Sequence, residues 1–349
     1  MIKFGIVGCG RVAKVHAEAI HESEHAELFA LCDINPARLS HFAEAYEVTQ
    51  IFDQFEAMAG DPDIDVINIC TPNGLHAEMA VLAMKKGKHV IIEKPLATTV
   101  KDASQIIQTA RECRVKATVV HQNRFNQAIQ TTRKALEKDR FGALSYGAAS
   151  IRWHRSQGYY NQDAWRGTRK MADGALMNQG IHTIDLLIWM MGPVKRISGK
   201  VLTKLRNIEM EDIGTAIFEF ESGAVAILDG TVTVYPDDLG ASLHLFGEKG
   251  TVCIGGNAVN RIEKWRFSED FTLEEQTMLN QQKADPPSVY GDGHKHVVKD
   301  FIQSLHEDRN PYIPLEAGLN AVRAILAIYE SSKDGKTILL NNSASTTIS

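Results

Sequence analysis

The chain has 349 residues, of which 44% are hydrophobic and 23% charged, and its formal net charge is −5. This length favours two domains over one, and the acidic balance excludes proteins that bind nucleic acid through a basic face. No apolar run is long enough to span a membrane, and the first residues have a strand pattern rather than that of a signal peptide. The five cysteines lack C-x-x-C spacing, which predicts a cytoplasmic protein with free thiols and no structural zinc.

Residues 1–122 alternate between short apolar segments and amphipathic segments. The apolar segments predict strands, which lie at 3–8, 26–33, 66–71, 89–94 and 116–122. The amphipathic segments predict helices, which lie at 12–21, 36–46, 75–87 and 100–113. This alternation indicates a parallel, doubly wound sheet with right-handed crossovers.

Residues 123–349 have a different pattern. After a predicted helix, alternating apolar and polar residues predict strands at 196–205, 214–222, 224–234 and 241–254. A second α+β domain with a large, mostly antiparallel open sheet is therefore expected, closed by a helix at 315–335. The polar stretch 265–290 is predicted to be a surface excursion.

The sequence Gly8-x-Gly10-x-x-Ala13 lies between the first predicted strand and the first predicted helix. Gly8 permits a tight turn, Gly10 leaves room for a pyrophosphate, and Ala13 lets the helix pack closely on the strand. The start of the helix offers unpaired N–H groups to phosphates, beginning with Arg11 and Val12. The pattern in this context predicts that residues 1–122 form a dinucleotide-binding Rossmann domain.

Asp33 stands at the end of the second predicted strand, twenty residues after the glycine turn closes at Ala13. A carboxylate at this place accepts hydrogen bonds from a ribose diol and repels a 2′-phosphate. Asp33 therefore favours NAD over NADP. The alternative is a glycine turn and a helix-capping aspartate without any ligand.

Two other strands end in polar residues at the same edge, where open α/β sheets bind ligands. One is followed by three candidate cofactor-binding residues, Thr71, Asn73 and His76. His76 has the alternative role of a helix cap. The other strand ends in Glu93 and Lys94, whose ammonium can stabilise an alkoxide or relay a proton. Glu93 is expected either to pair with Lys94 or to hold the ribose, and the alternative is that both charges simply enter solvent.

The segment "GALMNQGIHTIDLLIWMMG" predicts a helix with Asn178, His182 and Asp185 on one face. A histidine with an acid three residues later is a candidate general acid/base with an orienting partner. The alternative is a histidine satisfied inside the core. No further His/Cys cluster at ligand spacing appears, so a metal site is not predicted.

These motifs together resemble those of the glucose–fructose oxidoreductase/inositol dehydrogenase (Gfo/Idh/MocA) family, in order and over essentially the whole chain. The resemblance implies an NAD-dependent dehydrogenase that oxidises a sugar or cyclitol and forms a homo-oligomer, a dimer or tetramer, through its C-terminal sheet. Lys94 and His182 match the family's catalytic lysine and histidine. Asn178 stands where many members have an aspartate, so it is expected to orient a hydroxyl while Lys94 and His182 carry the acid/base work.

Residues 151–187 look like the branch of this family that oxidises C3 of UDP-N-acetylglucosaminuronic acid for amino-sugar synthesis in bacterial surface polysaccharides. Arginines and a lysine there suit a carboxylate or diphosphate, and aromatic rings suit a sugar or base. The candidate substrate-binding residues are Arg155, Tyr159, Tyr160, Thr168 and Lys170, and Trp165 and Arg166 are also assigned to the cofactor. The alternative is an aromatic loop at a subunit contact.

Three functional interpretations follow from these residues. The first is a dehydrogenase of a UDP-sugar uronate, and the second is a dehydrogenase of inositol or a free aldose. The third, from another class, is a sensor of NAD and sugar without turnover. The presence of both Lys94 and His182 favours an enzyme over a sensor.

Overall fold

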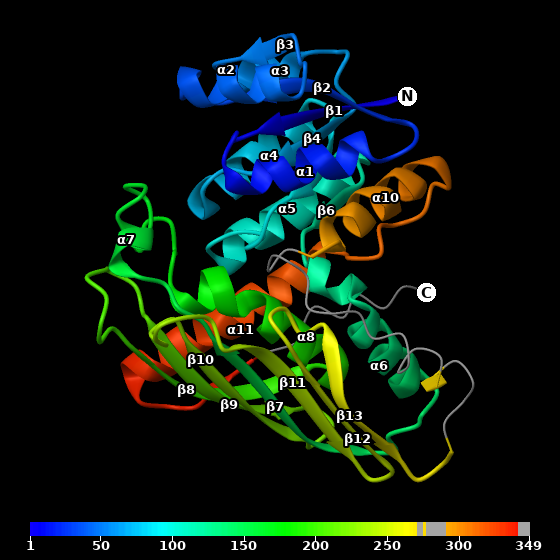
Figure 1. Cartoon of the computed structure of the whole chain (residues 1–349), viewed down its shortest axis with the longest axis vertical. Coiled ribbons are helices and arrows are strands. Elements are labelled where there is room, and N and C mark those ends of the chain that lie inside the picture. Colours follow the sequence, from blue (N-terminus) through cyan, green and yellow to red (C-terminus); the bar gives the residue numbers. More distant parts are fainter. Residues whose placement is uncertain (271–274, 277–290, 341–349) are drawn as a thin grey trace. The chain divides into compact units, whose positions relative to one another are not determined.

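The structure is a computed structural model that describes residues 1–270, 275–276 and 291–340. Its described residues form two compact units, one from residues 1–122 and 290–322 and the other from residues 123–289 and 323–349. The segment 290–322 therefore packs with the first unit although it follows the second in the sequence. Figure 1 shows each unit as a sheet with packed helices.

The first unit is built on a six-stranded sheet in which every paired strand is parallel. Its strands are β1 (Ile2–Val7), β2 (Ala26–Cys32), β3 (Gln50–Phe52), β4 (Val66–Ile69), β5 (His89–Ile92) and β6 (Ala117–Val119). The spatial order β3-β2-β1-β4-β5-β6 reverses direction between β1 and β4. Ligands of doubly wound sheets bind outside the carboxyl ends of the strands at this reversal.

Helices follow the strands of this sheet. They are α1 (Arg11–His21), α2 (Pro36–Ala45), α3 (Phe55–Gly60), η1 (Asn73–Leu75), α4 (His76–Lys85), α5 (Val100–Cys113) and η2 (Gln122–Phe125). Local chemistry fixes their starts: Asn35 accepts hydrogen bonds from two N–H groups at the start of α2, and Thr99 caps α5. The returning segment adds α10 (Gly293–His306), which packs on α1, and the first part of α11 (Leu315–Asp334).

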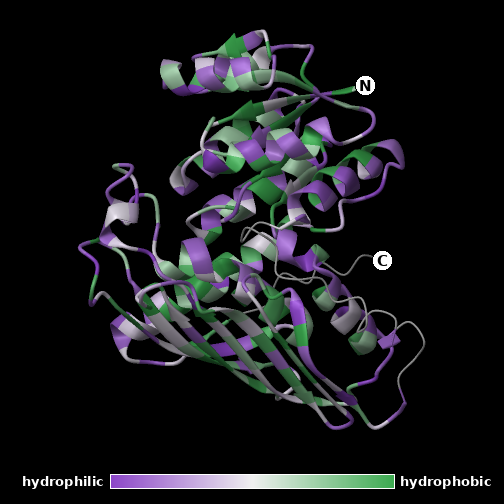
Figure 2. Ribbon diagram, viewed as in Figure 1, coloured by the Kyte–Doolittle hydropathy of each residue, from purple (hydrophilic) through white to green (hydrophobic). Residues whose placement is uncertain are grey.

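The second unit is built on an eight-stranded sheet in the order β13-β12-β11-β7-β10-β9-β8-β14. The strands are β7 (Leu144–Arg152), β8 (Val194–Leu202), β9 (Ile213–Phe220), β10 (Val225–Thr231), β11 (Gly240–Gly247), β12 (Gly250–Gly255), β13 (Arg261–Phe267) and β14 (Ile338–Leu339). All pairings are antiparallel except that of β7 with β10. Hydrophobic and hydrophilic residues alternate along these strands, as Figure 2 shows, so one face is buried and the other open.

The helices of the second unit are α6 (Gln127–Glu137), α7 (Gln157–Tyr160), the π-helix η3 (Ala175–Gly180), α8 (Ile181–Met191) and the rest of α11. The apolar helix α8 packs on β7 and β11 and covers the buried face. Of the predicted excursion at 265–290, Trp265 lies in β13 with only 5% exposed, and residues 271–274 and 277–290 are outside the described residues.

The predicted fold class, a parallel Rossmann sheet followed by a mostly antiparallel open sheet, is confirmed. Several elements were not anticipated, namely β3, α3, β7, β13 and α10. In the part of the chain that the structure describes, no helix is long and apolar enough to cross a membrane.

Candidate active site

The glycine turn at the carboxyl end of β1 passes close to the main chain of Cys70 and leaves the start of α1 uncrowded. Gly8 has φ +89°, and a Cβ at this residue would lie 2.8 Å from the carbonyl oxygen of Cys70. Gly10 caps α1, and a Cβ there would meet nothing within 4 Å. The N-terminus of α1, with Arg11 and Val12, is therefore open to an anion, and the residues present fit a dinucleotide.

Asp33 is held in place before any ligand binds. Its Oδ2 accepts a hydrogen bond from the Cys9 N–H at 2.7 Å, and its Oδ1 accepts one from the Asn35 N–H at 2.7 Å. The side chain is 9% exposed, at the end of β2. The carboxylate therefore also supports the glycine turn, in addition to the predicted contact with a ribose.

The residues after β4 form a turn whose centre is buried. Asn73 begins η1 and is buried, whereas Thr71 is half-buried and donates weakly to the sulfur of Met79. His76 is fully buried, with Nδ1 2.7 Å from the carbonyl oxygen of Pro95 and Nε2 2.8 Å from that of Thr71. Both ring nitrogens of His76 therefore face the main chain, and its contact with the cofactor stays a prediction.

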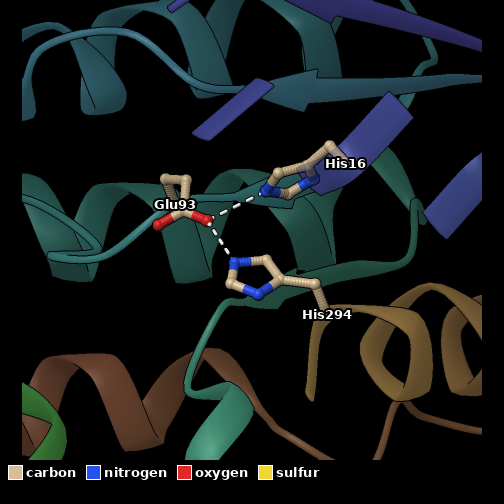
Figure 3. Close-up of side chains that lie close together, drawn as sticks. All are labelled: His16, Glu93 and His294. Carbon is tan, nitrogen blue, oxygen red and sulfur yellow. Dashed lines mark hydrogen bonds and ion pairs between the residues drawn. The ribbon is translucent and has the colours of Figure 1, made fainter. Parts of the chain in front are cut away.

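Lys94 follows β5 at the same edge and is half-buried. Glu93 beside it is 5% exposed and points inward, as Figure 3 shows. Its Oε1 lies 2.9 Å from His16 Nε2 and 3.2 Å from His294 Nε2, and its Oε2 accepts the Lys94 N–H at 3.2 Å. The oxygens of Glu93 therefore contact buried imidazoles and the Lys94 N–H, and the expectation that Glu93 pairs with Lys94 or holds the ribose stays a prediction.

The surroundings of Glu93 favour its ionised form. Burial alone would raise the pKa of its carboxyl, but hydrogen bonds from His16 and His294 outweigh burial and hold the pKa well below the usual range. Burial lowers the pKa of His294, against the hydrogen bond to Glu93. Glu93 is therefore a carboxylate that accepts hydrogen bonds from two imidazoles.

In the second unit, Asn178 lies in η3, the π-helical turn that precedes α8. Its Nδ2 donates a short hydrogen bond to Oδ1 of Asp173, which is 1% exposed. The other oxygen of Asp173 accepts the Gly167 N–H at 2.7 Å. The amide nitrogen of Asn178 is therefore held by a carboxylate, and the predicted contact of Asn178 with a ligand hydroxyl stays a prediction.

His182 lies in the first turn of α8 and is 9% exposed. Asp185, its predicted orienting partner, accepts hydrogen bonds from Arg124 Nε at 2.8 Å and Nη2 at 2.6 Å. Both members of this ion pair are buried. The bidentate arginine fixes the Asp185 carboxylate, and it is a partner that the sequence did not indicate.

A second buried glutamate supports η3. Glu211 accepts the Leu176 N–H at 2.8 Å and the Tyr329 hydroxyl at 3.0 Å through Oε1. Burial, with a smaller contribution from the nearby Asp173, raises the pKa of this carboxyl to about 7. A Cβ at Gly174 would lie 2.2 Å from Glu211 Oε2, so only glycine leaves room for the carboxyl group.

The predicted substrate loop after β7 forms an arginine–aromatic cluster. The guanidinium of Arg166 stacks on Tyr159 and Trp165, with its carbon 4.4 and 4.6 Å from the ring centroids. Its Nη1 donates to the Tyr159 hydroxyl at 2.6 Å, and its Nε donates to Asp163 at 3.3 Å. The structure therefore brings these predicted residues together, although Arg166 already has an acidic partner.

The other predicted substrate residues are placed less uniformly. Arg155 forms an ion pair with Asp238 at 3.0 Å, and the Thr168 hydroxyl donates to the Trp165 carbonyl. Lys170 is exposed. Tyr160 is only 4% exposed and packs edge-on against the neighbouring Tyr159, and the stacking of its ring on a sugar stays a prediction.

The fold and these residues define a nicotinamide-dependent oxidoreductase with a Rossmann unit. Residues 2–121 match the model of the oxidoreductase family with an NAD-binding Rossmann fold, and residues 129–253 match that of the GFO/IDH/MocA C-terminal domain. The chain therefore belongs to the Gfo/Idh/MocA oxidoreductase family. It is an NAD-dependent dehydrogenase, as the sequence predicts.

Solved structures include similar proteins. The WlbA dehydrogenase of Bordetella pertussis, in complex with NADH and UDP-GlcNAcA, is 36% identical over 97% of this chain and 99% of that chain, with a TM-score of 0.88. The WlbA dehydrogenase of Chromobacterium violaceum, with the same two ligands, is 33% identical over 98% and 96% with a TM-score of 0.90. The myo-inositol 2-dehydrogenase of Thermotoga maritima is 24% identical over 97% of this chain and 98% of that protein.

Proposed function

We propose that this dehydrogenase oxidises C3 of UDP-N-acetylglucosaminuronic acid (UDP-GlcNAcA) to the 3-keto sugar, for amino-sugar synthesis in surface polysaccharides. The observation that carries the proposal is the 36% identity, over 97% of the chain, to a WlbA dehydrogenase solved with NADH and UDP-GlcNAcA. The match covers 97% of the chain and therefore extends through both units.

When bound, NAD would supply the acceptor for the hydride that leaves the sugar carbon. The substrate hydroxyl must lose its proton at the same time, which leaves a carbonyl. We assign the proton to His182 and the stabilisation of the developing negative charge on oxygen to the Lys94 ammonium. Asn178, whose amide nitrogen faces Asp173, accepts a hydrogen bond from a sugar hydroxyl through Oδ1.

We assign the cofactor to the glycine turn and to the neighbouring strand ends. Gly8, Gly10 and the first N–H groups of α1 hold the pyrophosphate, and Asp33 holds the adenosine ribose. Thr71 and Asn73, at the end of β4, border the same edge of the sheet.

The loop after β7 is assigned to the charged parts of the substrate. Arg155 and Arg166 each bind a carboxylate in the structure, from Asp238 and Asp163. A uronate carboxylate or a diphosphate offers the same planar or multidentate acceptor geometry and can exchange with these aspartates. Tyr159 and Trp165, half-buried beside Arg166, provide rings for stacking.

We also propose a homo-oligomer formed through the open face of the second sheet. Ile217 and Ile227 are paired across β9 and β10 and are 49% and 42% exposed, and Tyr146 on β7 is 36% exposed. Apolar side chains gathered on one sheet face favour burial against another copy. Light scattering should show a dimer or tetramer that shifts toward monomer in Ile227→Glu, and a wild-type monomer would contradict the proposal.

A cytoplasmic location is proposed as well, because all five cysteines are free thiols in the structure.

The function is tested by a single-turnover reaction with the enzyme in excess, NAD present, and either UDP-GlcNAcA, UDP-N-acetylglucosamine or myo-inositol. NADH formation with UDP-GlcNAcA, with the 3-keto product identified by NMR, is expected. UDP-N-acetylglucosamine lacks the carboxylate and should react at least about tenfold more slowly, since a charged hydrogen bond is lost. Turnover with myo-inositol alone would assign a cyclitol dehydrogenase, and ligand-induced thermal shifts without turnover would assign a sensor.

A further inference from the structure

Glu93 is the point at which two helices, α1 and α10, meet the segment that carries Lys94 (Figure 3). Its Oε1 lies within hydrogen-bond distance of His16 on α1 and His294 on α10, and its Oε2 accepts the Lys94 N–H. Glu93, His16 and His294 are each no more than 5% exposed. The carboxylate therefore ties the main chain of Lys94 to two helices in the interior of the first unit.

The proton positions in this cluster follow from Asn68 on β4, which is buried and forms a hydrogen bond to His16. The side-chain N–H of Asn68 donates to His16 Nδ1 at 2.8 Å, so Nδ1 is an acceptor and the proton of the neutral ring is on Nε2. His16 therefore donates to Glu93 from Nε2. With His294 neutral as well, both imidazoles act as N–H donors to one carboxylate oxygen, and the other oxygen is directed to Lys94.

The residue after Lys94 is held in a comparable way. His76 Nδ1 faces the Pro95 carbonyl oxygen at 2.7 Å, and its Nε2 faces that of Thr71 at 2.8 Å. Burial lowers the pKa of His76, so the ring is neutral and donates to one of these carbonyl groups. Lys94 therefore lies between two residues that buried imidazoles contact: His16 and His294 contact the Glu93 carboxylate, and His76 contacts the Pro95 carbonyl group.

We propose that Glu93, together with His16 and His294, is the positioning residue that sets the direction of the Lys94 ammonium toward the substrate oxygen. The role rests on the proposed function, in which Lys94 stabilises the developing charge. Such stabilisation depends on donors fixed before the reaction, because a group that must reorient loses much of its effect. Glu93 acts through the Lys94 N–H and does not touch the substrate.

The same three side chains have ligand atoms within 4.8 Å of one another, a spacing that a divalent cation also accepts. The hydrogen bonds favour direct contact of the imidazole N–H groups with the carboxylate over a bound cation. A metal ligand needs a bare nitrogen, and here Asn68 leaves the proton of His16 on the nitrogen that faces Glu93. Metal analysis of the purified protein is therefore an arm of the test.

Glu93→Gln is the decisive variant, because it keeps the shape and removes the charge. The amide NH₂ of Gln must face either the imidazole N–H groups or the Lys94 N–H, so one contact becomes donor against donor. The kcat with UDP-GlcNAcA should fall about tenfold or more, while the Kd for NAD should change by less than about threefold. In a Lys94→Met background the same substitution should change kcat by less than about twofold, since residues that act as a unit are not additive.

A second readout needs no substrate. Two imidazole donors compete with one backbone donor for the single oxygen of Gln, so its NH₂ is expected to face the Lys94 N–H. Hydrogen exchange of the Lys94 amide should then be at least about tenfold faster in Glu93→Gln, because this N–H no longer has an acceptor. Thr118→Val is the matched control: it removes a buried hydrogen bond to the Ile313 carbonyl from β6 of the same sheet. This control should leave the Lys94 exchange rate unchanged and kcat within about twofold. If Glu93→Gln does not fold, His294→Phe removes one donor and should change both readouts in the same direction but less.

Each outcome decides the proposal. Unchanged Lys94 exchange in Glu93→Gln overturns it, and so does an equal fall in kcat in the wild-type and Lys94→Met backgrounds, which indicates a merely structural role. One divalent cation per chain that is lost in Glu93→Gln replaces it with a metal centre. If wild-type protein turns over none of the sugars, the proposed function fails, and the exchange result alone then supports or rejects Glu93 as the residue that holds Lys94.

Discussion

Two buried glutamates, one in each unit, show how the same side chain takes different charge states. Glu93 accepts the backbone N–H of Lys94, a predicted catalytic residue. Glu211 accepts the backbone N–H of Leu176, which lies in the same turn as the predicted catalytic residue Asn178. Imidazole donors hold the pKa of Glu93 well below its usual range. Glu211 has a phenol as its side-chain donor and lies near Asp173, and burial raises its pKa to about 7.

The comparison teaches that burial alone does not decide the charge of a carboxyl group. Both side chains are almost fully buried, so desolvation acts on both in the same direction. The difference comes from the side-chain donors: two imidazoles compensate for the lost water at Glu93, whereas a single phenol with backbone N–H groups does not at Glu211. The first unit therefore supports its segment with a fixed charge, and the second with a group that titrates near neutrality.

The largest expected effect tests whether Lys94 in the first unit and His182 in the second serve one reaction. Lys94→Met and His182→Ala should each lower turnover by about 10²–10⁴, and the double variant should lose little more. Steady-state rates with NAD and UDP-GlcNAcA measure this, and Lys101→Met, an exposed lysine on α5, serves as the control. A Lys94→Met enzyme within threefold of wild type would end the catalytic assignment of Lys94. If the loss in the double variant equalled the product of the two single losses, Lys94 and His182 would act independently.

An intermediate effect concerns Asp33, a third buried carboxylate that also accepts backbone N–H groups. NAD should bind more than about tenfold tighter than NADP, because a carboxylate repels the 2′-phosphate. Asp33→Ala should relax this preference and also weaken NAD binding, since the Cys9 N–H loses its acceptor. Calorimetric titration of both cofactors measures the change. Equal affinities in the wild-type protein would remove Asp33 from the ribose site.

The smallest expected effect sharpens the contrast in charge. The pKa of Glu211 is raised on folding, so its contribution to stability is complete below its ordinary pKa and is lost as pH rises through about 7. Between pH 6 and 8 this loss is roughly 1 kcal/mol. Glu211→Gln cannot titrate, so its Tm should fall less than that of wild type over this range by a few degrees. If the Tm of wild type and of Glu211→Gln changed equally between pH 6 and pH 8, the raised pKa of Glu211 would be refuted.

The sequence predicts features that depend on neighbouring residues. The strands of the first sheet follow from apolar runs, and the glycine turn, Asp33 and Lys94 follow from their places at strand ends. The contacts that support these residues join distant parts of the chain: Glu93 meets His16 from 77 residues away and His294 from 201 residues away. Neither histidine has a local pattern that distinguishes it from a surface histidine.

The same reason applies in the second unit. The three-residue spacing predicts that Asp185 orients His182, and it gives no sign of the bidentate partner Arg124, which lies 61 residues earlier. Tyr160 was expected to contact a ligand with its neighbour, and adjacent residues of the short helix α7 point in different directions, so one ring is buried. The π-helical turn at η3 also has no signal in the apolar spacing.

The discontinuous first unit has a consequence for synthesis on the ribosome. Residues 1–122 contain all six strands of its sheet, but α10 is translated only after the whole of the second sheet except β14. Until His294 has left the exit tunnel, Glu93 lacks one of its two imidazole donors and α1 lacks the helix that packs on it. The nascent sheet therefore lacks the packing of α10 until synthesis is nearly complete. A fragment that ends at residue 122 should be less stable than the complete unit.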